Sequence, residues 1–368
     1  MERRGIAARQ GRTMNRFDQD DEQFQREDWT EQAGIGVGLT LPGADSVVVI
    51  TWLFLAINVG VWLVIQLVGG LFNQDEDLLL RFGAMFGPLI AIGEYWRLFT
   101  AMFLHANIFH LLFNCLALFI FGRLVEGVYG NVRFTVIYLL AGLAGGALSY
   151  MFNKSAISVG ASGAIFGILG ALAAYFIVHR DTLGEMGRRN LTGIATIAAI
   201  NLAIGLLIPN IDNWAHFGGL AGGFVIGLAL APRYMYEFVE TPFGTRRRIV
   251  ALLPLGARWL AVLAFAAFLA AFIWYSGTDV SDTQQSQIFV VRAERLLQDG
   301  DTVGALQHAE RAVELDSLNG SAYYTRGKIM AIHGATDQAL SDFSASLRLP
   351  GLTGAQREDA IKFIASPR

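Results

Sequence analysis

Long apolar runs separated by short polar stretches dominate the middle of the chain. Each of seven runs has roughly the length that an α-helix needs to cross a bilayer, about 20 residues. They lie at 47–70, 98–121, 134–152, 160–178, 191–209, 213–231 and 257–276. The fourth and fifth runs contain no charged residue. The pattern therefore predicts an all-α protein, a polytopic membrane bundle of seven transmembrane helices.

The two ends of the chain follow different patterns. Residues 1–45 are polar and rich in Arg, Asp, Glu and Gln, which predicts a disordered arm. After the seventh run, Gly300 and Ala305-Leu306 recur 34 residues later as Gly334 and Ala339-Leu340. This spacing resembles the tetratricopeptide repeat, a helix–turn–helix unit. We expect a small α-helical repeat domain, capped by a helix near 355–364, that either binds a protein or peptide partner or is a plain helical hairpin without one.

These patterns divide the chain into four segments. They are the arm at 1–45, a six-span core at 46–233, a loop with the seventh helix at 234–278, and the repeat domain at 279–368. Hydrophobic residues make up 54% of the chain and charged residues 16%, against roughly 25% charged in soluble proteins. An integral membrane protein is expected, and the net charge of -3 gives no reason to expect a nucleic-acid partner.

The basic residues of the loops predict the orientation of the bundle. Loops after the second, fourth and sixth runs contain ten Lys and Arg residues, counting Arg258 at the very start of the seventh run, and those after the first, third and fifth contain three. The positive-inside rule then places the N-terminus in the cytoplasm and, after seven spans, the repeat domain outside it. This layout fits a bacterial plasma membrane. The loop at 72–96 is expected to lie partly in the outer interface.

A candidate nucleophile lies at the start of the fourth run, in Gly160-Ala161-Ser162-Gly163. Small residues on both sides leave the Ser162 hydroxyl accessible. The free N–H groups and positive dipole at a helix N-terminus can stabilise an oxyanion there. Serine is also a common N-cap, so this stretch alone does not decide between chemistry and structure.

Four further polar residues stand out within the apolar runs, where such groups are costly and usually functional or paired. They are His105, His110 and Asn114 in the second run and His216 near the start of the sixth. By the predicted orientation they share the outer side with Ser162. His110 and Asn114 are four residues apart and share a helix face.

Glycine spacing explains how the fourth and sixth helices could meet. Gly163 and Gly167 are four residues apart, as are Gly219 and Gly223, and small residues at this spacing allow close helix approach. Such an approach would bring Ser162 within hydrogen-bond reach of His216, the arrangement of an activated serine nucleophile.

Other side chains complete the expected site. Asn114 and His110 could donate hydrogen bonds to an oxyanion, and Phe166, one turn after Ser162, could stack on His216. No acidic residue is placed as a third member, which predicts a Ser–His dyad.

Taken in order, the motifs resemble the rhomboid intramembrane serine proteases over roughly residues 47–231. The matching stretches are Glu94-Tyr95-Trp96-Arg97-Leu98-Phe99-Thr100, His105-Ala106-Asn107-Ile108-Phe109-His110 with Asn114, Gly160-Ala161-Ser162-Gly163, and Asn213-Trp214-Ala215-His216 with Gly219 and Gly223.

The resemblance implies a serine-type endopeptidase that hydrolyses single-pass transmembrane proteins in or beside their spans. Ser162 would be the nucleophile and His216 the general base and acid. Asn114, His110 and the Ser162 N–H would form the oxyanion hole. Trp96 and Arg97 would belong to a loop seated in the outer leaflet, and neither metal nor cofactor is needed.

Other hypotheses stay open at this point. A non-catalytic rhomboid-like protein that binds membrane clients typically lacks the serine or the histidine, and this chain has both. A transporter would have polar residues along a path through the membrane. His105 could be a satisfied polar residue near the interface. The histidine spacing matches no helical pair of zinc ligands.

Overall fold

The structure is a computed structural model that describes residues 48–69, 76–208, 211–241, 244–252, 254–277 and 281–365. All of these residues belong to one compact unit, Ser46–Arg368. The predicted polar arm at 1–45 lies outside the described residues.

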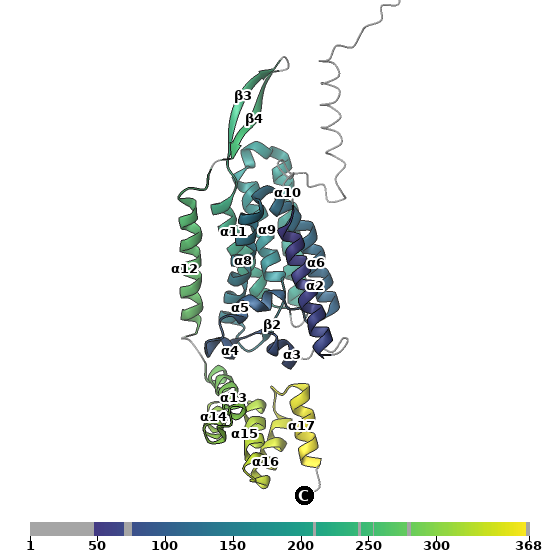
Figure 1. The fold of residues 1–368 in the computed structure, drawn as a ribbon, viewed down its shortest axis with the longest axis vertical. Coiled ribbons are helices and arrows are strands. Elements are labelled where there is room, and N and C mark those ends of the chain that lie inside the picture. The colour runs from purple at the N-terminus through teal and green to yellow at the C-terminus, as the bar shows by residue number, and fades with distance from the viewer. Residues whose placement is uncertain are drawn as a thin grey trace, which may run out of the picture. The chain divides into compact units, whose positions relative to one another are not determined.

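A bundle of long helices forms the core, and a helix overlaps each of the seven apolar runs (Figure 1). They are α2 (Ile50–Gly69), α6 (Ile108–Ala117) continued by η3 (Leu118–Gly122) and α7 (Arg123–Tyr129), α8 (Asn131–Phe152), α9 (Ser162–Val178), α10 (Arg180–Leu207), α11 (Asn213–Leu230) and α12 (Arg258–Ser276).

Five of these helical stretches are long and apolar enough to cross a membrane: 50–69, 108–129, 131–152, 180–207 and 258–276. Helix α9 is apolar but has 17 residues. Helix α11 begins with the polar Asn213 and includes His216. The helical, membrane-type bundle is confirmed, and the count of seven spans stays a prediction.

The predicted start of the second span, at residue 98, is wrong. Residues 97–103 form two short helices, α5 (Arg97–Thr100) and η2 (Ala101–Phe103), and the chain is extended at Leu104. Helix α6 begins only after Asn107, whose side chain accepts a hydrogen bond from the His110 N–H at 2.9 Å. Most of residues 98–104 are apolar because they are packed inside the protein: Leu98 and the run 101–104 are buried, whereas Phe99 is exposed. His105 therefore precedes the helix.

Short elements gather at the end of the bundle where α9 begins (Figure 1). They are α3 (Glu76–Arg81), β1 (Met85–Phe86), α4 (Gly87–Ala91) and β2 (Ile157–Ser158). Strands β1 and β2 are antiparallel, with Met85 opposite Ser158. The segment before α4 is thus joined to the segment that leads into α9.

A second strand pair was not anticipated from the sequence. Strands β3 (Tyr234–Thr241) and β4 (Gly244–Leu252) form an antiparallel hairpin within the stretch expected to be a loop. Tyr, Phe, Val, Thr and Ile in these strands favour extended backbone. The all-α prediction holds for the long elements of the core and omits both strand pairs.

A buried carboxylate holds the start of α2. Glu126 of α7 accepts hydrogen bonds from the backbone N–H groups of Val49 (2.9 Å), Ile50 (2.7 Å) and Thr51 (2.8 Å). A helix N-terminus has free N–H donors and a positive dipole, so a carboxylate satisfies both. The charge is stabilised by these contacts, and α2 is joined to α7.

The C-terminal segment folds into antiparallel helix pairs. They are α13 (Asp282–Gln298) with α14 (Thr302–Leu315), and α15 (Gly320–Ile332) with α16 (Thr336–Arg348), followed by α17 (Gly354–Ala365). Alanines at the contacts, such as Ala305 and Ala309, are fully buried and allow close packing. Paired hydrogen bonds to Asp342 hold the pKa of Arg326 above its ordinary value. Whether these pairs are tetratricopeptide repeats stays a prediction.

Candidate active site

Helices α9 and α11 pack so closely that the backbone of one contacts the backbone of the other. A Cβ atom added at Gly219 would lie 1.9 Å from the carbonyl oxygen of Gly163, and one added at Gly223 would lie 2.0 Å from that of Gly167. Any larger side chain would collide with backbone. The predicted glycine contact is therefore present.

Ser162 and His216 meet at the end of this contact. Ser162 is the first residue of α9, and its Oγ lies 2.9 Å from Nε2 of His216. The serine is half-buried, whereas His216 is only 7% exposed. The hydrogen bond that the glycine spacing predicts is thus present in the structure.

Packing fixes the orientation of the His216 ring. The ring of Phe166 lies parallel to it, with 4.3 Å between centroids and 13° between planes. Its Nδ1 is buried and makes no hydrogen bond with any described residue. One nitrogen of the imidazole thus contacts the Ser162 hydroxyl. The other makes no hydrogen bond with a carboxylate among the described residues.

His110 and Asn114 lie on α6, and the His110 ring is beside the serine. Gly160 has φ +130°, and a Cβ there would lie 2.7 Å from both Cε1 and Nε2 of His110 and 3.7 Å from Ser162 Oγ. The imidazole and the hydroxyl therefore flank the same glycine. The Asn114 side chain donates to the His110 carbonyl at 2.8 Å, which uses one of its two amide hydrogens.

His105 is fully buried in the segment before α6. Its ring stands edge-on to the ring of His110, with 5.2 Å between centroids. It therefore contacts the histidine that flanks the serine. The structure gives it the position of a packing partner for His110.

Trp96 and Arg97 brace the loop between α3 and α5. The Arg97 guanidinium donates to the carbonyls of Leu80 (2.6 Å) and Ala84 (3.0 Å) and to the Glu94 carboxylate (2.5 Å). The same guanidinium lies over the Trp96 ring, 4.6 Å from its centroid. Neither side chain is part of the Ser162–His216 contact.

One polar cluster near the site was missed by the sequence analysis. Asp212 precedes α11, and its Oδ1 accepts a hydrogen bond from the Ala215 N–H at 3.1 Å. Its Oδ2 accepts hydrogen bonds from Ser149 Oγ and, at 2.6 Å, from Ser158 Oγ. An aspartate just before an apolar helix is a recognisable N-cap signal, but the two serines are distant in sequence and give none.

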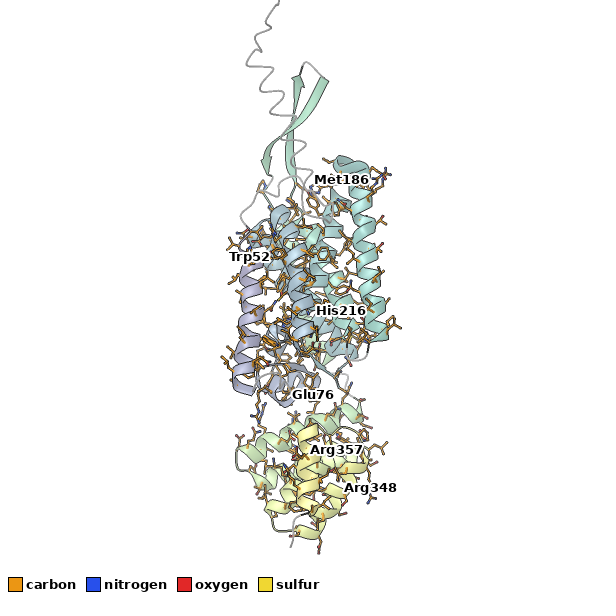
Figure 2. The ribbon with its side chains drawn as sticks, turned by 90° about the vertical axis from the view of Figure 1, so that its right-hand side faces the viewer. Trp52, Glu76, Met186, His216, Arg348 and Arg357 are labelled. Atoms are coloured by element: carbon orange, nitrogen blue, oxygen red, sulfur yellow. The ribbon has the colours of Figure 1, made fainter. Side chains whose placement is uncertain are left out.

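The site lies toward one end of the bundle. In Figure 2, His216 is on the side of Glu76, in α3, and far from Met186, near the start of α10. This is the end at which α3, α4 and β2 gather. Ser162, whose Oγ is 2.9 Å from His216 Nε2, therefore lies in the same half of the bundle as these short elements.

The geometry is suited to nucleophilic catalysis. An imidazole nitrogen at hydrogen-bond distance can accept the proton of a hydroxyl as that hydroxyl attacks an electrophile. Free N–H groups of the first turn of α9 face the same region and can stabilise negative charge. A hydroxyl, a base and donors thus share one small volume.

A family profile and several individual proteins that resemble this chain all point to the same family. The family profile described as the rhomboid domain matches residues 92–233. The chain is 36% identical over 301 residues to the rhomboid protease GluP of Bacillus subtilis, which covers 79% of this chain and 52% of that protein. It is 36% identical over 138 residues to the putative rhomboid protease YdcA of the same organism, covering 37% of this chain and 68% of YdcA.

A plant relative extends the similarity. The mitochondrial RHOMBOID-like protein 6 of Arabidopsis thaliana is 44% identical over 181 residues, or 48% of this chain and 58% of that protein. The chain thus spans little more than half the length of GluP and of this plant protein.

The glycine contact leads to a direct prediction. Replacing Gly219 with Ala places a methyl group 1.9 Å from a backbone oxygen, so α11 must move away from α9. Overpacking of this kind costs about 1–3 kcal/mol. We expect labelling of Ser162 by a fluorophosphonate to slow at least tenfold, measured by mass spectrometry.

Gly60→Ala is the matched control, because a Cβ there meets no atom within 4 Å. It should label at the wild-type rate. A folded Gly219→Ala protein that also labels at that rate would refute the importance of the close approach.

Proposed function

The chain belongs to the rhomboid family, and on that premise we propose that it is an intramembrane serine endopeptidase that cleaves single-pass transmembrane proteins within or beside their spans. The family and the apolar helices make it an integral membrane protein. The observation that supports catalysis is the 2.9 Å contact between Ser162 Oγ and His216 Nε2.

In the proposed mechanism, Ser162 attacks the carbonyl carbon of the scissile peptide bond. His216 Nε2 takes the hydroxyl proton as the new C–O bond forms, and the carbonyl oxygen becomes an oxyanion. Collapse of this intermediate breaks the C–N bond, and His216 returns the proton to the leaving amine. Water then hydrolyses the acyl-enzyme by the same steps, with His216 again as the base. No metal or cofactor takes part.

The oxyanion would form beside the first turn of α9. The Ser162 N–H, His110 and the second N–H of Asn114 are the proposed donors, and one such donor is worth about 3 kcal/mol in the transition state. The position of His110 beside Gly160 supports its role. Phe166 would keep the His216 ring in place by stacking.

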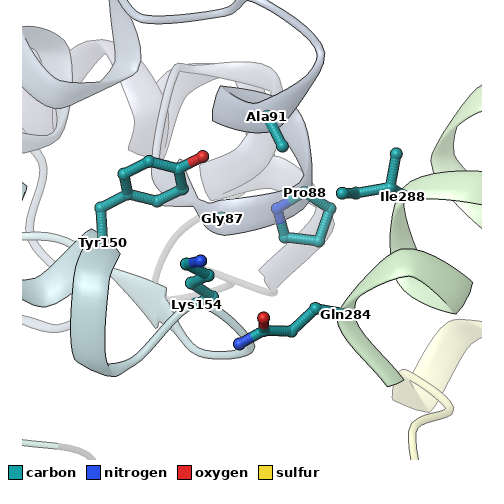
Figure 3. A pocket seen from close by; sticks show the side chains of 7 residues that line it. All are labelled: Gly87, Pro88, Ala91, Tyr150, Lys154, Gln284 and Ile288. Carbon is teal, nitrogen blue, oxygen red and sulfur yellow. The ribbon is translucent and has the colours of Figure 1, made fainter. Parts of the chain in front are cut away.

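We also propose seven spans in a bacterial plasma membrane, with the N-terminus in the cytoplasm and residues 279–368 outside it. The contact between α13 and α4 supports this orientation, because it joins the C-terminal helices to the end of the bundle near Ser162. Arg295 pairs with Glu94 at the same place. Figure 3 shows the residues that line a pocket there: Gly87, Pro88, Ala91, Tyr150, Lys154, Gln284 and Ile288.

The C-terminal helix pairs are proposed to be tetratricopeptide-like repeats that bind a protein or peptide. Helices α14 and α16 begin 34 residues apart, at Thr302 and Thr336, which matches the period of that repeat. Helix α17 covers the apolar cluster around Phe343 and Ala360. It would thereby cap the second pair.

A serine-reactive probe tests the catalytic proposal. A fluorophosphonate should label the wild-type protein in membranes and leave Ser162→Ala unlabelled, because only a serine activated by a base reacts readily. His216→Ala should lose at least 100-fold in labelling rate. Equal labelling of wild type and Ser162→Ala would contradict the protease and favour a non-catalytic, client-binding protein.

The orientation is tested by cysteine labelling in intact cells. Cys115 is the lone native cysteine, so the background is Cys115→Ala. Leu318, between α14 and α15, is 66% exposed, and Leu318→Cys should react with a membrane-impermeant maleimide.

The matched variant for the opposite side is Glu185→Cys, whose native side chain is 63% exposed. It should react only after the cells are permeabilised. Protection of residue 318 in intact cells would overturn the proposed orientation.

A further inference from the structure

Asp212 lies where three elements of the site converge. Its Oδ2 accepts hydrogen bonds from Ser149, at the end of α8, and from Ser158, in β2. Its Oδ1 caps α11 through the Ala215 N–H. One carboxylate thus has partners on α8, on β2 and on α11.

Two of these elements, β2 and α11, lie next to a reacting group in the sequence. Ser158 lies four residues before Ser162, and Asp212 lies four residues, about one helical turn, before His216. Between them, the Gly160 N–H donates to the Ala101 carbonyl at 2.9 Å, which fixes the remaining part of this segment. A shift at the carboxylate would therefore change the separation of Ser162 and His216.

Resting on the proposed protease function, we infer that Asp212 is a positioning residue, which holds the strand before Ser162 and the helix that contains His216 at a fixed separation. Its carboxylate accepts a hydrogen bond from the Ser158 hydroxyl of the strand and another from the Ala215 N–H of the helix.

The chemistry explains why a carboxylate occupies this position. Two hydroxyl donors converge on a single oxygen, which requires an acceptor with two free lone pairs, and the second oxygen must accept an N–H. Hydrogen bonds to an ionised oxygen are shorter and stronger than neutral ones. The positive end of α11 further stabilises the negative charge.

Asp212 does not act as the third member of a catalytic triad in this structure. Both of its oxygens already accept hydrogen bonds from Ser149, Ser158 and Ala215. The His216 Nδ1 makes no hydrogen bond with any described residue. Its effect on the reaction is therefore through the placement of the two elements rather than through the histidine proton.

The test compares Asp212→Ala, Asp212→Asn, Ser158→Ala and the Asp212→Ala/Ser158→Ala double variant. The full-length protein in proteoliposomes is assayed for kcat and KM on one single-span substrate, together with the midpoint of thermal unfolding. A displacement of about 1 Å can cost 10²-fold in rate, so Asp212→Ala should lower kcat about 100-fold with KM changed less than threefold.

Asp212→Asn separates positioning from simple capping. Asparagine caps a helix as well as aspartate does, but it replaces the oxygen that accepts both hydroxyls with an N–H donor. We expect about a tenfold loss in kcat with the unfolding midpoint unchanged. Ser158→Ala should also lower kcat, and its effect should vanish in the Asp212→Ala background, because interacting residues are not additive.

Asp301→Ala is the matched control, because Asp301 caps α14 through the Gly304 N–H at 2.9 Å and lies outside the membrane core. It should keep the wild-type kcat.

Wild-type kcat in both Asp212→Asn and Ser158→Ala would overturn the inference, as would fully additive losses in the double variant. If Asp212→Ala does not fold, the kcat values of Asp212→Asn and Ser158→Ala still test the inference. Ser162→Ala, assayed in parallel, tests the proposed function separately.

Discussion

The backbone contact between α9 and α11 is the constraint on which the rest of the site depends. Serine and histidine side chains are short, and a 2.9 Å hydrogen bond between them requires their helices to be closer than ordinary side-chain packing allows. Glycines at 219 and 223 remove the atoms that would prevent it. The hydroxyl of Tyr129 reinforces the contact deeper in the bundle, because it donates to the carbonyls of Ala171 in α9 and Gly227 in α11.

Charged groups that are buried or half-buried fix the elements that surround this contact. Glu126 holds the start of α2, Arg97 holds the loop before α5, and Asp212 joins α11 to α8 and β2. A charge in an apolar bundle is destabilising unless several hydrogen bonds compensate it, and each of these groups has at least three such partners. Each therefore permits few alternative arrangements of the elements it joins.

The parts of this structure that follow local rules could be predicted from the sequence. The apolar runs predicted the long helices, and the glycines spaced by four predicted the helix contact that brings Ser162 to His216. The start of α6 could not be predicted, because most of residues 98–104 are apolar side chains packed inside the protein, and the stretch resembles a membrane helix in composition. The β3–β4 hairpin was hidden in a charged loop. Ser149 and Ser158 gave no signal, because their common partner Asp212 is 63 and 54 residues away.

The most direct test of the central claim is to reconstitute the protein with a single-span substrate and identify the new termini by mass spectrometry. We expect one cut within or beside the outer half of the substrate span, with water supplying the new carboxylate oxygen, and no cut with Ser162→Ala. The same cut made by Ser162→Ala, or a cut confined to the cytoplasmic side, would contradict it.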